Sequence, residues 1–109
     1  MRKNILIVED DETSGLLISL MLKRITKEIL NARSGIEAID LCRNSPDIDL
    51  ILMDIKMPVM DGYNATHKIR QLGYNGDIWA LSADVIEGTS EKLTSIGFNG
   101  IILKPFKPN

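Results

Sequence analysis

The chain of 109 residues is long enough to bury one hydrophobic core and too short for two, so we expect a single domain over residues 1–109. With 13 Lys and Arg against 15 Asp and Glu, its net charge of −2 lacks the basic excess that direct nucleic acid binding requires. No apolar run approaches the roughly 20 residues of a membrane span, and the single Cys42 cannot form an internal disulfide, which favours a cytoplasmic protein.

Short apolar runs alternate with longer stretches of helical spacing along the chain. The uninterrupted run at 5–8 predicts a strand buried on both faces, and the runs at 50–53 and 101–103 repeat it. This alternation predicts an α/β fold with a doubly wound parallel sheet covered by helices. In chain order, the predicted elements are strand 5–8, helix 13–25, strand 28–32, helix 35–43, strand 50–53, helix 63–71, strand 78–81, helix 87–96 and strand 101–103.

The first predicted helix, 13–25, is apolar around most of its circumference. At about 100° per residue, its large apolar side chains cover roughly two-thirds of the surface, more than packing on one sheet face requires. Two interpretations stay open: a deeply buried helix, or a helix that docks a partner helix with part of this arc. Asp11 and Glu12 precede it and are expected to cap its N-terminus. The arc consists of Leu16, Leu17, Ile18, Leu20, Met21, Leu22 and Ile25.

Acidic side chains follow two of the predicted strands. Glu9 and Asp10 come directly after strand 5–8, and Asp54 comes directly after strand 50–53. In a parallel sheet of order 2-1-3-4-5, the strand order reverses between the first and third strands, and ligands bind at the carboxyl ends there. Three carboxylates at this position repel one another unless a cation neutralises them. A site of few carboxylates completed by water suits Mg²⁺.

Polar side chains also end the last two strands. Ser82 offers a hydroxyl, and Lys104 offers a mobile positive charge of the kind that binds phosphate. Taken singly, each site residue has an ordinary explanation as a helix cap, a turn or a surface residue. Together they favour Asp54 as a nucleophile that accepts a phosphoryl group, with Lys104 and the metal balancing charge and Ser82 holding the transferred oxygen.

Four segments of the chain resemble the receiver domain of two-component response regulators, most of all the receivers attached to hybrid sensor histidine kinases. The resemblance runs in order over nearly the whole chain and implies a flavodoxin-like (βα)5 fold. The segments that carry it are ILIVEDD at 5–11, LMDIKMPVMDGY at 52–63, ALSA at 80–83 and KPF at 104–106.

The resemblance implies that Asp54 accepts phosphate from a phosphohistidine on a histidine kinase or a histidine phosphotransfer domain. In the family pattern, Asp10, Asp54 and the backbone carbonyl of Lys56 ligate Mg²⁺ directly. Glu9 acts on the metal mainly through water.

Further roles follow from the same resemblance. Ser82 and Lys104 bind the phosphoryl group, and Ser82 shifts the loop that follows it. The peptide bond between Lys104 and Pro105 is expected to be cis. Lys56 and Asp84 occupy the positions that tune the lifetime of the aspartyl phosphate.

The chain departs from the family pattern in two places. Ile101 stands where the family usually has the Tyr or Phe that swings inward on activation, so the aromatic part of the switch is not expected. Only residues 105–109 follow the Lys104 position, and their two prolines argue against the family's fifth helix. The last strand would then expose one apolar flank, which favours self-association.

Two other functions compete with a phosphoryl acceptor. A phosphorylation-independent binding module would keep the fold without using the acids, and Ile101 favours it. A metal-dependent hydrolase with an aspartyl nucleophile needs a general acid two residues beyond it, where this chain has Lys56.

Four remaining residues have structural interpretations. His67 is expected on the solvated surface, Cys42 as a small buried apolar group, and Trp79 in the core. Gly62 follows Asp61 and suits a turn with positive φ.

Overall fold

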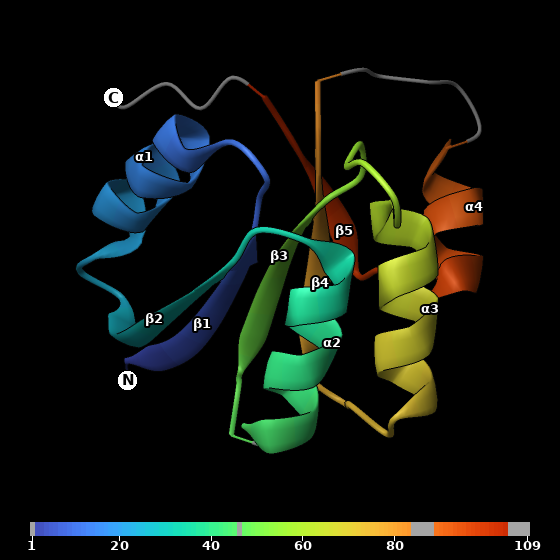
Figure 1. Ribbon diagram of the computed structural model, residues 1–109, viewed down its shortest axis with the longest axis horizontal. Helices are drawn as coiled ribbons and strands as arrows, with labels where there is room; N and C mark the ends of the chain where they lie inside the picture. Colours follow the sequence, from blue (N-terminus) through green and yellow to red (C-terminus); the bar gives the residue numbers. More distant parts are fainter. Residues whose placement is uncertain (1, 46, 84–88, 105–109) are drawn as a thin grey trace.

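Five parallel strands form one sheet in the computed structural model, which describes residues 2–45, 47–83 and 89–104 (Figure 1). The strand order is β2-β1-β3-β4-β5, as predicted, and the alternation of strands and helices confirms the doubly wound α/β fold. The elements are β1 (Lys3–Val8), α1 (Glu12–Leu22), β2 (Thr26–Ala32), α2 (Gly35–Asn44), β3 (Leu50–Asp54), α3 (Gly62–Gln71), β4 (Asp77–Ser82), α4 (Thr89–Ile96) and β5 (Gly100–Leu103). The predicted beginning of α4 at residue 87 lies outside the described residues.

The central strands are apolar without interruption because both of their faces are covered. In β1, Leu6 and Val8 pack into one hydrophobic cluster, while Ile5 and Ile7 pack into a second cluster on the opposite face. All four side chains are at most 1% exposed. Successive side chains of a strand point to opposite faces, so a run of four apolar residues serves both clusters.

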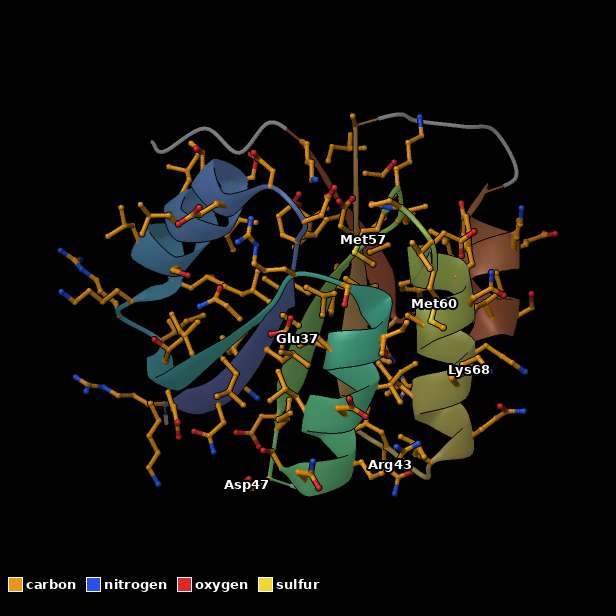
Figure 2. The ribbon with its side chains drawn as sticks, viewed as in Figure 1. Glu37, Arg43, Asp47, Met57, Met60 and Lys68 are labelled. Carbon is orange, nitrogen blue, oxygen red and sulfur yellow. The ribbon has the colours of Figure 1, made fainter. Side chains whose placement is uncertain are left out.

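The two faces of the sheet are covered unequally (Figure 1). Helices α2, α3 and α4 cover one of them, which we call the three-helix face, and α1 covers the other, the one-helix face. Met57 and Met60, in the loop after β3, join the cluster of the three-helix face (Figure 2). Four helices are present among the described residues, and none of these is a fifth helix after β5.

The one-helix face is only partly buried because α1 lies over β1 and β2. Strands β4 and β5 are further along the sheet, and Trp79 and Ile102 on this face are half-buried. The prediction of Trp79 as a core residue is therefore confirmed only in part: it packs against the cluster but is not fully buried. Leu103 alternates with Ile102 along β5 and therefore lies on the opposite, three-helix face, where it is 46% exposed.

Helix α1 begins one residue before the predicted helix and ends three residues before the predicted end. Asp11 caps it, since its carboxylate accepts a hydrogen bond of 2.9 Å from the Ser14 backbone N–H, and Glu12 opens the first turn. Residues 23–25 form a turn instead of helix, because the Lys3 backbone N–H donates to the Ile25 carbonyl as β1 and β2 begin to pair. Leu16 and Leu20 are 61% and 62% exposed, so the helix is not deeply buried.

Arg70 connects the ends of three elements. Its Nε donates to the Gly97 carbonyl at 2.9 Å, and Nη1 donates to the carbonyls of Tyr74 and Gly76 at 2.9 and 2.7 Å. Its Nη2 donates to Oδ1 of Asn99 at 2.9 Å, and the same oxygen accepts from the N–H at the start of β4. One guanidinium therefore fixes the end of α3, the end of α4 and the two loops leading into β4 and β5.

Candidate functional site

The carboxyl ends of β1 and β3 bring the predicted acids together. Asp54 ends β3, the central strand, and is 4% exposed, while Glu9 follows β1 and is 5% exposed. Carboxylate oxygens of Glu9, Asp10 and Asp54 all lie within 4.8 Å of one another. The strand-order reversal between β1 and β3 creates this convergence, as the spacing along the chain predicted.

Gly62 allows the chain after β3 to fold back against Asp54. A Cβ at this position would lie 2.2 Å from the Asp54 carbonyl oxygen, so a side chain has no room there. The prediction of a positive φ at Gly62 is wrong, because Gly62 is the first residue of α3 and the glycine serves close approach instead. Positive φ occurs in this loop at Val59, with φ of 69°.

Lys104 lies directly beyond β5 and reaches the acids from the side. Its Nζ is 2.5 Å from Oε2 of Glu9 and 3.2 Å from Oδ1 of Asp54. The Lys104 backbone N–H donates to the Ser82 carbonyl at 2.7 Å, which fixes the end of β5 beside the end of β4. Burial disfavours the charged amine, but the hydrogen bond to Glu9 and the charges of both acids outweigh this and raise the pKa of Lys104.

The Asp54 carboxylate is destabilised in its charged form. Burial raises its pKa to about 6, the neighbouring charge of Glu9 adds to the shift, and Lys104 opposes it. Three carboxylates and one ammonium leave two negative charges in excess at the site. An oxygen-rich donor set with this excess fits a hard divalent cation such as Mg²⁺.

A cavity of about 250 Å³ opens beside Asp54. It is lined by six of the seven predicted site residues that the structure describes, which come from the ends of four strands. Ser14 also lines it and escaped the sequence analysis, although its position three residues after the cap Asp11 was a usable signal; its hydroxyl donates to Asp11 at 2.6 Å. The lining residues are Glu9, Asp10, Asp11, Ser14, Asp54, Lys56, Leu81, Ser82, Ala83 and Lys104.

The remaining predicted residues lie elsewhere. Ile101 is half-buried in β5 and packs against the cluster of the three-helix face. His67 is exposed, as predicted, and Cys42 is half-buried, with burial raising the pKa of its thiol to about 11. Asp84 and the peptide bond to Pro105 lie outside the described residues.

Known proteins are similar to this chain over most of its length. The family model for the response regulator receiver domain matches residues 5–109. The autoinducer 2 sensor kinase/phosphatase LuxQ of Vibrio harveyi is 35% identical over 96% of the chain, and two-component system protein A of Emericella nidulans is 36% identical over 95%. The chain spans only 12% and 16% of these two relatives.

Solved structures agree with the sequence matches. The receiver domain of sensor histidine kinase PA1611 from Pseudomonas aeruginosa, solved with magnesium coordinated in its active site cleft, is 35% identical with a TM-score of 0.84. This match covers 98% of the chain and 88% of the solved one. The chemotaxis protein CheY4 of Vibrio cholerae, at 24% identity, has the same fold with a TM-score of 0.90 over 99% of the chain and 91% of its own length.

No helix in the described part of the chain is both long and apolar enough to cross a membrane. The site at the carboxyl edge of a 2-1-3-4-5 sheet and the match over residues 5–109 lead to one conclusion. The chain belongs to the family of response regulator receiver domains.

Proposed function

We propose that this receiver domain accepts a phosphoryl group on Asp54 from a phosphohistidine of a partner protein. The observation that carries the proposal is the cavity in which a nearly buried carboxylate meets two further acids, an ammonium and a hydroxyl-bearing residue. An Asp54 oxygen forms a bond to phosphorus while the bond from phosphorus to the imidazole nitrogen breaks, and its electron pair stays on that nitrogen. The chain is thus a phosphoryl acceptor that assists the transfer, rather than an enzyme with a separate substrate.

Lys104 and Ser82 are the proposed ligands of the incoming phosphoryl group. The Lys104 ammonium already lies 3.2 Å from Asp54 and neutralises charge on the oxygens that are transferred. Ser82 ends β4, which lies between β3 and β5 in the sheet, at the wall of the same cavity. Transfer adds negative charge at Asp54, and we expect Ser82 and Lys104 to move toward it.

The donor set fits Mg²⁺ held by Asp10, Asp54 and the Lys56 backbone carbonyl, with Glu9 acting through water. Magnesium in the cleft of the similar PA1611 receiver domain supports this assignment. When bound, the ion offsets the charge of the acids and of the phosphoryl oxygens. Lys56 and Asp84 are the proposed lifetime-tuning positions, and Ile101 replaces the aromatic switch residue.

The proposed partner is a histidine kinase or a histidine phosphotransfer domain that docks beside the site. Leu16 and Leu17, in the half of α1 nearest Asp10, are 61% and 38% exposed and offer an apolar surface for a partner helix. The proposed compartment is the cytoplasm, where a free thiol such as Cys42 stays reduced.

Incubation with phosphoramidate and Mg²⁺, followed by intact-protein mass spectrometry, tests the acceptor. We expect one added phosphoryl group in the wild type and in the control Asp40→Asn, an exposed carboxylate, and none in Asp54→Asn or with EDTA. Equal labelling of Asp54→Asn would contradict the proposal. A phosphorylation-independent binding module predicts instead that a beryllofluoride mimic leaves partner affinity unchanged, and the intact acidic set argues against it.

A further inference from the structure

The corner of the molecule opposite the site carries a group of exposed cations. The turn after α1 and the start of β1 lie side by side there, because the Lys3 backbone N–H donates to the Ile25 carbonyl at 2.9 Å. Nitrogen-tipped side chains project from this corner in Figure 2. We call these five exposed residues the basic corner: Arg2, Lys3, Lys23, Arg24 and Lys27.

The charge of the basic corner is balanced only in part locally, by Asp47 and Asp49, which lie beside Asn4 at the beginning of β1. None of its five residues forms an ion pair with another described residue. Glu28 is the only acid within residues 2–3 and 23–28, and it alternates along β2 with Ile29, which packs on the one-helix face. Its side chain is therefore directed to the opposite face of the sheet from Lys27. Five positive charges gathered on a chain of net charge −2 make this a strongly polarised molecule.

Apolar side chains accompany these cations. Leu20, in the last two turns of α1, is 62% exposed, and Ile25, in the turn itself, is 50% exposed. Aliphatic groups beside a cluster of four to eight Lys or Arg are the features that bind proteins to the surface of an anionic bilayer. The cations are attracted to the lipid headgroups, and the aliphatic groups enter the boundary below them.

We infer that the basic corner binds peripherally to anionic membrane surfaces. The corner lies at the amino ends of β1 and β2, and the acids lie at the carboxyl end of β1, about 20 Å away for a strand of six residues. Electrostatic attraction to the lipid acts over about one Debye length, roughly 8–10 Å, so the basic corner faces the bilayer and the cavity faces away from it. Membrane contact and phosphoryl transfer therefore use different ends of the molecule.

Vesicle cosedimentation of the whole chain tests this inference. We expect binding to vesicles of 70% phosphatidylcholine and 30% phosphatidylserine, which weakens as salt increases, and none to phosphatidylcholine alone. Each removed cation should weaken binding about fivefold, so Lys23→Glu with Lys27→Glu should lose at least about 25-fold. Ile25→Ser should lose a few-fold through the aliphatic contact alone.

A matched double variant separates the corner from net charge. Arg43→Glu with Lys68→Glu reverses two exposed cations on α2 and α3, away from the corner, and should retain binding (Figure 2). Equal loss in both double variants, or no binding of the wild type at low salt, would overturn the inference. So would binding to polyglutamate without binding to vesicles, which would indicate an acidic protein partner. Labelling by phosphoramidate in solution does not involve the corner, so it reports on Asp54 independently.

Discussion

The two faces of the sheet are built from the same strands and differ in how completely they are covered. On the three-helix face, Ile51, Ile69 and Ile78 are fully buried. On the one-helix face, Ile5, Ile7 and Leu81 are buried as well, but Trp79 and Ile102 stay half-buried. Because the stabilisation from burial scales with the apolar area removed from water, we conclude that the three-helix face supplies most of the stability.

The largest loss of stability is expected at a fully buried residue of the three-helix face. Ile69→Ala on α3 removes a side chain that is 0% exposed and leaves a cavity among three helices. We expect a loss of about 2–5 kcal/mol in the free energy of unfolding, measured by urea denaturation. A loss below about 1 kcal/mol would mean that this face is not the better packed one.

Asp54→Asn tests stability at the carboxyl edge of the sheet, which both faces share. The substitution removes the repulsion between Asp54 and the neighbouring acids Glu9 and Asp10. In the folded protein the pKa of Asp54 is raised from 3.8 to about 6, so its stabilising contribution is present below about pH 4 and is lost as pH rises through 6. Without metal at pH 7.5, Asp54→Asn should therefore be more stable than the wild type by about 1–3 kcal/mol.

Thermal unfolding in EDTA across pH 4 to 8 measures this difference. It should shrink toward pH 4, and the exposed control Asp40→Asn should show no comparable change between the two ends of the range. A stability difference between Asp54→Asn and the wild type that does not depend on pH would contradict the proposed cause.

A smaller effect is expected on the one-helix face. Ile102→Ala truncates a half-buried side chain of the same cluster as Trp79. Solvent already reaches the Ile102 side chain in the wild type. We expect a loss of about 1 kcal/mol, again by urea denaturation, because less area is removed from water at this position. A loss equal to that of Ile69→Ala would break the comparison between the faces.

The smallest effect on stability is expected at Leu103, which is 46% exposed. Leu103→Lys should change the free energy of unfolding by no more than about 0.5 kcal/mol. If the exposed end of β5 promotes self-association, sedimentation at increasing concentration should show larger species for the wild type than for this variant. Identical sedimentation of the two proteins would remove β5 from any self-association surface.

The elements and their order followed from patterns that depend on local sequence. The four-residue run at 5–8 predicted burial on both faces, and the acids after β1 and β3 predicted convergence, because strand order alone decides which ends meet. Asp54, Ser82 and Lys104 line one cavity for the same reason. Their spacing along the chain, at strand ends, was sufficient information.

Other features depend on contacts between distant segments and were not predictable in this way. The apolar pattern continues to Ile25, yet α1 stops at Leu22, since pairing with β1 requires an extended chain by Thr26. Gly62 was assigned to a turn because the sequence does not show that the Asp54 carbonyl occupies the space of a Cβ. The four hydrogen bonds of Arg70 join residues up to 29 positions apart, which no local pattern reveals.

Arg70 also constrains how α4 is able to move. The guanidinium donates a hydrogen bond to the carbonyl of Gly97, directly after the last turn of that helix, whereas Lys92 nearer its beginning contacts α3 by lying over the Tyr63 ring, 4.8 Å from the ring centre. A helix that is held at one end rotates about that end, so the displacement of a residue increases with its distance from the hydrogen-bonded end. Any shift of α4 would therefore be greatest at Thr89, the end that follows Ser82 along the chain. It would be smallest at Ile96, the end that precedes β5.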